Sequence, residues 1–273
     1  MRTESSNRPI MPVVPEPFAL IVGRMGDGGE AGFMGALRRM GLRPETVTTK
    51  DMRAEAPLVR VRFGSTSALI GRASADTLDL ADPLHPATSQ LAPRLDETWR
   101  DVGRVWAVIP EAEGSLDTAG DMAVRLREFF KAMVLLIDLF DASHIFWTPA
   151  RLWTDAPQFR DAIAEMLASG MPPVLHLVAF RRSDAPGGGA IVRTRGLALF
   201  GGQEIEGRIP VGWTVAEMVR RLARLALDIL LNGPVAAPRR LRGLDPGEWV
   251  SLTPVADEAD GSGTVRVEFG SDL

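Results

Sequence analysis

The chain contains no cysteine among its 273 residues. This absence excludes disulfide bonds, thiolate metal sites and thiol nucleophiles. Tyrosine is absent too, although there are six tryptophans, and this uneven use of aromatic residues identifies no ligand. The sequence also lacks a G-x-S-x-G segment, so nothing in it predicts the nucleophile elbow of a serine hydrolase.

Long apolar runs are missing as well. The longest, residues 132–140, is interrupted by Asp138, whereas a membrane-spanning helix needs about 20 mostly apolar residues. Lys and Arg together number 31 against 35 Asp and Glu, and the resulting net charge of -4 disfavours a general nucleic-acid-binding surface. The polar residues 1–17 lack the apolar core of a secretory signal. We therefore expect a cytoplasmic protein that binds neither nucleic acid nor membranes.

The length of the chain and its 45% of hydrophobic residues allow a substantial core, in one large domain or two small ones. We expect a flexible N-terminal arm over residues 1–17 and one α+β domain over residues 18–233. Residues 234–273 are expected to form a C-terminal linker and a hairpin extension. Whether this hairpin joins the main sheet or contacts a partner stays open at this point.

Periodicity predicts the elements of the first half of the chain. Apolar residues at spacings of three and four along residues 122–140 are typical of a core-facing helix. Residues 73–93 are rich in Asp, Pro and Ser and predict an irregular connection, followed by a short helix with Leu95 and Trp99. The other expected elements are a strand at 18–22, a helix through 33–40, a hairpin with strands at 59–63 and 68–70, and strands at 105–109 and 145–147.

The second half predicts a helix ending at Gly170 and then an apolar strand at residues 174–180, which we expect in the centre of its sheet. Strands at residues 191–194 and 197–200 are expected to pair with it in antiparallel fashion. Together with the first half, these elements predict an α+β fold with a mainly antiparallel or mixed sheet packed against helices. Ferredoxin-like elements are one arrangement compatible with this order.

The last helix has the clearest local signals. Thr214 and Glu217 have the spacing of a capping box at its start, and the Asn-Gly-Pro sequence at residues 232–234 predicts its end. Beyond an arginine-rich linker at residues 239–242, strands at 249–252 and 265–269 are expected to form the closing hairpin.

The glycine-rich stretch after the first strand fits a dinucleotide fingerprint. Gly26, Gly28 and Ala31 match G-x-G-x-x-[GA], and Asp51 follows about twenty residues later. Against this interpretation, the hairpin that comes next does not continue a strand-helix alternation. The alternative is a turn that contacts an anion at the helix start, and the candidate residues for either are Gly26, Gly28 and Gly29.

Polar residues on the expected strands suggest one acid-base site. His144 and His176 both belong to apolar strands and would meet if these strands were neighbours in a sheet. Glu204 and Glu206 are two residues apart, so on a strand both carboxylates face the same side, as an acid pair or a cation site requires. The alternatives are histidines held in the core and glutamates paired with arginines. No pair of histidines has the spacing of a local metal motif, so we predict no metal site and no cofactor.

Trp147, Arg151 and Trp153 combine flat apolar surface with a guanidinium group. This combination suits a cation-π contact or a protein interface. The alternative is that these residues cap the core.

Two segments resemble a known family. Residues 142–153 read ASHIFWTPARLW and are followed by Phe159, and residues 195–206 read RGLALFGGQEIE. With the order of the expected elements, they resemble the bacterial family called domain of unknown function 4261 (DUF4261), over about residues 18–232. The resemblance implies an α+β fold and a cytosolic bacterial origin, and it implies no activity or catalytic residues. The tail from Pro234 onward is then an addition to the domain of that family.

Three classes of function stay open. The leading hypothesis is a non-enzymatic interaction or accessory protein with a protein partner, because capped helices and buried strands occur without a convergent catalytic motif. The alternative is a small-ligand or nucleotide-binding protein or an enzyme, with a polar site around His144, His176, Glu204 and Glu206; one concave pocket containing these residues would favour it. The third is a structural homodimer, which requires a broad exposed apolar patch.

Overall fold

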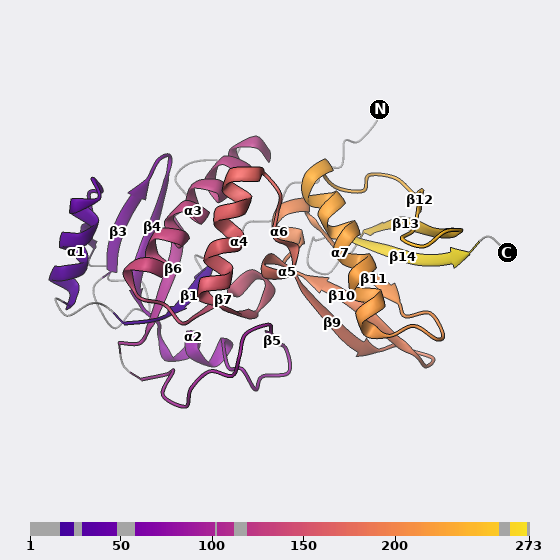
Figure 1. Ribbon diagram of the computed structural model, residues 1–273, viewed down its shortest axis with the longest axis horizontal. Coiled ribbons are helices and arrows are strands. Elements are labelled where there is room, and N and C mark those ends of the chain that lie inside the picture. Colours follow the sequence, from indigo (N-terminus) through magenta and orange to yellow (C-terminus); the bar gives the residue numbers. More distant parts are fainter. Residues whose placement is uncertain are drawn as a thin grey trace. The chain divides into compact units, whose positions relative to one another are not determined.

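The computed structural model describes residues 17–24, 29–47, 58–101, 103–111, 119–256 and 263–271. These residues form seven α-helices and two mixed sheets, which confirms the predicted α+β fold (Figure 1). The two sheets belong to two compact units, and the division between the units falls between His176 and Leu177. We call them the first unit and the C-terminal unit.

The first unit contains an eight-stranded sheet with the order β2-β3-β4-β6-β1-β7-β8-β5. All neighbours are antiparallel except the parallel pair of β5 and β8. The four residues of β1 are all apolar and fully buried, because β1 has neighbours on both sides and both faces of the sheet are covered at this point. The strands are β1 (Ala19–Val22), β2 (Glu45–Val47), β3 (Leu58–Phe63), β4 (Thr66–Arg72), β5 (Ser89–Gln90), β6 (Val105–Glu111), β7 (His144–Trp147) and β8 (Leu152–Asp155).

One face of this sheet packs against helices. The ring of Phe130 in α3 lies 5.7 Å from that of Trp147 on β7, and Phe140 stacks on Trp106 of β6 at 5.1 Å. The predicted apolar stripe of the long helix is therefore confirmed as core from Leu126 onward. The helices of this unit are α1 (Gly29–Arg39), α2 (Ala75–Leu80), α3 (Ala119–Leu139), the 3-10 turn η1 (Thr148–Ala150), α4 (Ala156–Ser169) and α5 (Val174–Leu177), whose last residue is already assigned to the C-terminal unit.

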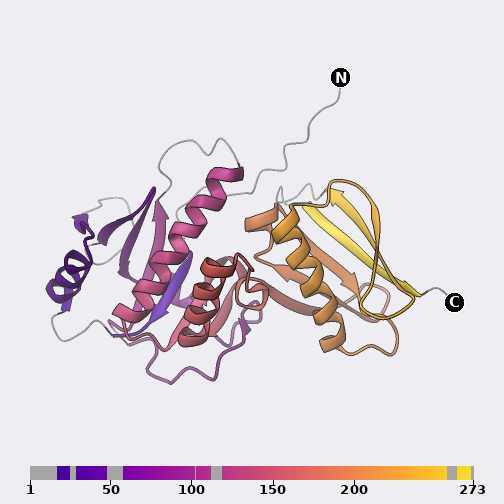
Figure 2. The same cartoon turned by 45° about the horizontal axis from the view of Figure 1, so that its top comes forward.

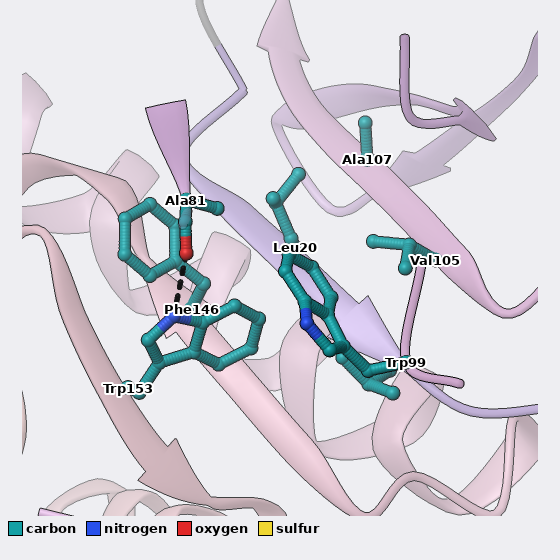
Figure 3. Close-up of a cluster of buried hydrophobic side chains, with 8 residues drawn as sticks. Leu20, Ala81, Trp99, Val105, Ala107, Phe146 and Trp153 are labelled. Carbon is teal, nitrogen blue, oxygen red and sulfur yellow. Dashed lines mark hydrogen bonds between the residues drawn. The ribbon is translucent and has the colours of Figure 1, made fainter. Parts of the chain in front are cut away.

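The opposite face of the sheet is covered by residues 73–101, and Figure 3 shows the cluster that they help to form. Successive strand residues alternate between faces, so Leu20, Ala107 and Phe146 face this segment. Trp99 packs edge-on to Trp153 at 5.3 Å, and the Trp153 indole donates a 2.7 Å hydrogen bond to the Ala81 carbonyl. Packing and the buried hydrogen bond from Trp153 thus hold the segment against the sheet.

The C-terminal unit contains a six-stranded sheet with the order β12-β13-β14-β11-β10-β9. Neighbours are antiparallel except for β11 and β14, which are parallel. Helix α7 lies across this sheet in Figures 1 and 2, and its core side is Met218, Leu222, Ala226 and Ile229. The elements are β9 (Ala179–Asp184), β10 (Ala190–Arg195), α6 (Ala198–Gly201), β11 (Gln203–Arg208), α7 (Val215–Asn232), β12 (Arg239–Arg242), β13 (Glu248–Ala256) and β14 (Gly263–Ser271).

Helix α7 begins and ends where its sequence predicts. The Thr214 hydroxyl accepts from the Glu217 N–H, and the Glu217 carboxylate accepts from the Thr214 N–H, so the capping box is confirmed. At the other end Gly233 has a φ of 88°, a backbone conformation that few residues other than glycine adopt. The predicted end of α4 at Gly170 is confirmed in the same way, with a φ of 79°.

Residues 174–180 do not form the predicted central strand. Residues Val174–Leu177 make the helical turn α5, in which the His176 N–H donates to the Pro173 carbonyl at 2.9 Å, because proline favours the first turn of a helix. The strand that follows, β9, is the last of its sheet instead of a central one. Its second half is charged and exposed, as is typical of edge strands.

Three further predictions were wrong. Residues 197–200 do not form a strand, because Ala198–Gly201 is the short helix α6, and glycines with positive φ stand at 196 and 202, on either side of it. Residues 95–99 contain a turn closed by the Trp99 N–H on the Asp96 carbonyl, and the predicted irregular connection before it contains α2 and β5. The arginine-rich linker at 239–242 is strand β12, whose partner β13 lies later in the chain.

The C-terminal hairpin joins a sheet, since β14 pairs with β11 along five residues. The segment expected as an extension, residues 234–273, supplies β12, β13 and β14 of the C-terminal unit. The segment expected as one domain, residues 18–233, contributes to both units. No helix in the described part of the chain combines the length and apolar character needed to span a bilayer.

Candidate functional site

Only part of the predicted glycine turn can be placed. Gly26 and Gly28 lie outside the described residues. Gly29 is the first residue of α1, with a φ of 53°, and a side chain at this position would meet no other segment among the described residues. The anion or nucleotide turn stays a prediction.

The two candidate histidines lie on opposite faces of the first sheet. His144 Nε2 is 3.3 Å from the Pro93 carbonyl oxygen, on the face covered by residues 73–101. His176 Nδ1 is 2.9 Å from the hydroxyl of Thr154, which neighbours Trp153 in the strand and therefore points to the other face. Burial lowers the pKa of His176, although the nearby Asp155 carboxylate opposes this effect. Each histidine is thus hydrogen-bonded to residues on its own face of the sheet, and the two side chains do not form one site.

Glu204 is buried and has a structural role. Its carboxylate accepts hydrogen bonds from the Thr194 hydroxyl at 2.7 Å, the Gly196 N–H at 2.8 Å and the Ala198 N–H at 3.1 Å. Burial raises the pKa of Glu204 above its ordinary range, and these hydrogen bonds oppose the rise. The carboxylate thereby holds the turn between β10 and α6.

Glu206 stands opposite Arg193 on β10 and Arg266 on β14 in the strand registers. This placement agrees with the alternative that the glutamate is a partner for arginines. The two glutamates belong to the C-terminal unit and the two histidines to the first unit, so neither unit contains the four-residue polar site.

The predicted aromatic interface belongs to the core of the first unit. The side chains of Trp147 and Trp153 are 0% and 1% exposed, so they cannot form a contact surface. Arg151 donates to the Leu80 carbonyl at 2.6 Å and has a φ of 48°, which is uncommon outside glycine. Arg151 and Trp153 together fasten residues 73–101 to the sheet.

A cavity of about 270 Å³ in the C-terminal unit is the strongest candidate site. Helix α7 forms one wall with Arg221, Arg224, Leu225 and Asp228, whose spacing places them on one side of the helix. The opposite wall comes from β12, β13, β14 and the residues after β12. Its lining is Arg239, Leu241, Arg242, Gly243, Leu244, Glu248, Val250 and Phe269.

Arg221 is the buried cation of this site, with 5% of its side chain exposed. Its Nε lies 2.9 and 3.0 Å from the two oxygens of Glu248, its Nη2 donates to the same carboxylate at 2.7 Å, and Asp245 accepts a further bond. The guanidinium also lies 3.9 Å from the centre of the Trp213 ring. The hydrogen bond from Arg221 lowers the pKa of Glu248, against the effect of burial.

The other arginines of the cavity differ in their partners. Arg239 forms an ion pair with Asp228 at 2.6 Å. Arg224 donates to the carbonyl of Gly243 at 3.3 Å, and the Arg242 guanidinium lies 6.0 Å from the centre of the Trp249 ring. Within the described ranges, neither Arg224 nor Arg242 forms an ion pair with a carboxylate. Both are exposed. Arg242 borders the cavity, but strand alternation places its side chain with that of its partner Trp249, on the face away from Leu241 and Val250. Arg224 therefore contributes an exposed positive charge to the cavity that these carboxylates do not neutralise.

The base of the cavity is apolar. Leu241, Val250 and Phe269 stand opposite one another on β12, β13 and β14, so their side chains form one row on the face towards α7. Leu225 adds apolar surface from the helix. Phe269 is supported by the Trp213 ring, whose centre lies 5.0 Å away.

Sequence reasoning missed this site because it treated residues 239–242 as a linker. A usable signal was present in α7, where Arg221 and Asp228 occupy positions of the apolar side of the helix. Charged residues at such positions are rare unless they are paired. Among the residues that the structure describes, no cluster of three or more His, Asp or Glu side chains is placed to hold a metal ion.

Comparison with known proteins identifies no relative: no protein-family model, no curated protein and no solved structure matches this chain. The resemblance to the DUF4261 family therefore stays a prediction.

Proposed function

We propose that the protein is a non-enzymatic binding protein, and that the cavity of the C-terminal unit receives an acidic group. The observation that supports this proposal is Arg224, an exposed cation at the cavity that has no carboxylate partner among the described residues. Arginine is suited to this role because its planar guanidinium binds a carboxylate or a phosphate with two parallel hydrogen bonds.

The ion pairs in the walls make the site rigid. Arg221 is fixed by Glu248 and Arg239 by Asp228, so these two arginines are already neutralised and their side chains are ordered before a ligand arrives. A preformed site loses less conformational entropy on binding. The added negative charge of a ligand is then matched by Arg224.

The hydrogen bonds of the candidate acid-base residues support the non-enzymatic part of the proposal. Glu204 is occupied by three hydrogen bonds and His176 by Thr154, and both roles stabilise the fold. His144 bonds to the Ser143 hydroxyl through Nδ1 and to the Pro93 carbonyl through Nε2. Each of these residues has a structural task that accounts for its burial or position.

The acidic group can come from a small acid or from an acidic segment of a protein partner, and titration calorimetry separates the two sources. Acetate, inorganic phosphate and a short oligoglutamate peptide would be titrated into the full chain at low salt. We expect binding that weakens as the salt concentration rises, because exposed charges are screened. A peptide much tighter than either small anion would favour a protein source, and the reverse would favour a small acid.

A matched control variant changes another arginine of the same helix, α7. Arg224→Ala should abolish binding, whereas Arg220→Ala, an exposed arginine outside the cavity lining, should leave it unchanged. A ligand at ten times its Kd should also stabilise the wild type by about 1.4 kcal/mol in a thermal melt. Absence of binding for all three probes, or equal binding by the wild type and Arg224→Ala, would refute the proposal.

A further inference from the structure

We infer that the ligand of this cavity is a small acid with a flat apolar body, of the class of aryl carboxylates and aryl phosphates. The inference rests on the proposed function and names the ligand class of the same site. The apolar base of the cavity and its volume define this class, in addition to the positive charge that binds the acidic group.

The apolar base would contact the body of the ligand. Leu241, Val250 and Phe269 form a continuous cross-strand row, and Leu225 faces them from α7. A simple inorganic anion would leave this row in contact with water, whereas an apolar body would cover it and gain the free energy of that burial. A ligand with both parts therefore uses more of the surface that the cavity offers.

The Phe269 ring favours a flat body. Trp213 packs against it with an angle of 51° between the ring planes, and Val250 stands beside it on the neighbouring strand. A ring held in this way offers one preformed aromatic surface, and aromatic pairs gain more than their burial alone provides. Aryl groups would thus be preferred to aliphatic groups of equal size.

The cavity has room for a ligand of this class. Its volume of about 270 Å³ accommodates one aromatic ring with one acidic group.

The acidic group would lie at Arg224. This side chain reaches from α7 to the carbonyl of Gly243, which follows the last residue of β12. The acid would therefore bind near the end of β12, and the body would extend over Leu241 and Val250.

Titration calorimetry with matched pairs of probes tests the inference on the full chain. Benzoate is compared with acetate, phenyl phosphate with inorganic phosphate, and benzoate with cyclohexanecarboxylate. We expect each aryl acid to bind at least about tenfold more tightly than its partner without a ring. We also expect benzoate to bind a few-fold more tightly than the cyclohexane acid. The two aryl acids together show whether a carboxylate or a phosphate is preferred.

Two variants assign the effect to this cavity. Phe269→Leu keeps an apolar side chain and should remove most of the advantage of the aryl acids, while the binding of acetate and phosphate stays the same. Arg224→Ala should weaken all of the acids. A thermal melt of each variant establishes that it is folded, and direct contacts can be read from the chemical shifts of methyl groups in Leu225, Leu241 and Val250.

The outcomes separate the two proposals. Equal affinity for benzoate and acetate, lost in Arg224→Ala, would overturn the ligand class and leave the acidic-group proposal intact. Binding of none of the acids would overturn both. An aryl preference that survives Phe269→Leu would also overturn the inference, because the body would then lie elsewhere.

Discussion

Arg221 and Glu248 form a buried ion pair that joins α7 to the start of β13, with three nitrogen-oxygen distances of 2.9, 3.0 and 2.7 Å. Only 5% and 8% of the two side chains are exposed. Removal of Arg221 leaves Glu248 without its paired cation, and removal of Glu248 leaves the buried Arg221 with Asp245 as its remaining ion-pair partner. Either change is more costly than replacement of both partners by apolar residues. The pair forms part of the cavity wall, so it connects the stability of the unit with the shape of its site.

Glu248→Ala should therefore lower the free energy of unfolding by about 3 kcal/mol, at the lower end of the range for a broken buried pair, because Asp245 still contacts Arg221. Urea denaturation of the full chain measures this change. Glu268→Ala, on the neighbouring strand and exposed, is the control and should change stability by less than about 0.5 kcal/mol. The double variant Arg221→Met with Glu248→Leu should recover most of the loss. If Glu248→Ala were as stable as the control, the pair would not support the C-terminal unit.

The same pair predicts how stability changes with pH. Arg221 lowers the pKa of Glu248 in the folded state below its ordinary value of 4.5. The stabilisation is therefore complete above pH 4.5 and is lost as the pH falls through the lowered folded pKa. Urea melts between pH 3 and 7 should show this acid loss in the wild type. Glu248→Gln should show a smaller loss over the same interval, and an identical pH profile would contradict the assignment.

Glu204 should respond to pH in the opposite direction. Burial raises its folded pKa above 4.5, so the folded state binds the proton more readily than the unfolded state. Its contribution to stability grows as the pH falls from the raised folded pKa to the unfolded one, and it is smallest above both. Glu204→Gln should remove this dependence and retain the hydrogen bonds to Gly196 and Ala198. Glu204→Ala should cost about 1–3 kcal/mol, because two buried N–H groups lose their acceptor.

Comparison of these two variants at neutral pH tests the structural role of Glu204. A large loss in the alanine variant with a small one in the glutamine variant is expected. Two equal losses would point to a requirement for the charge itself, and the turn-holding role would then be wrong.

The bond from Trp153 to the Ala81 carbonyl predicts a local effect in the first unit. Trp153→Phe keeps an aromatic ring but leaves this buried carbonyl without its donor, at a cost of about 1–3 kcal/mol. Amide hydrogen exchange should rise most within residues 73–101, since this contact fastens that segment. Phe146→Leu, in the same cluster, removes packing without a polar contact and is the matched control. Uniform exchange changes in both variants would show that the contact does not act locally.

The sequence alone determined the elements whose signals are local. The limits of α7 follow from Thr214, Glu217 and Gly233, because capping involves residues within one helical turn. The hairpin of β3 and β4 and that of β13 and β14 follow from alternation on both sides of a connection. The α+β class and the core side of α3 required only the periodicity of apolar residues.

The tertiary structure alone decided where these elements meet and which side chains face one another. Strand β12 could not be recognised because its stability depends on β13, and β9 became an edge strand because of the strands that pair around it. Arg221 and Glu248 are 27 residues apart, and Trp153 and Ala81 are 72 apart. The cavity is built from such distant pairs. Propensity and spacing act over a few residues, whereas a site between a helix and a sheet depends on the packing of the whole unit.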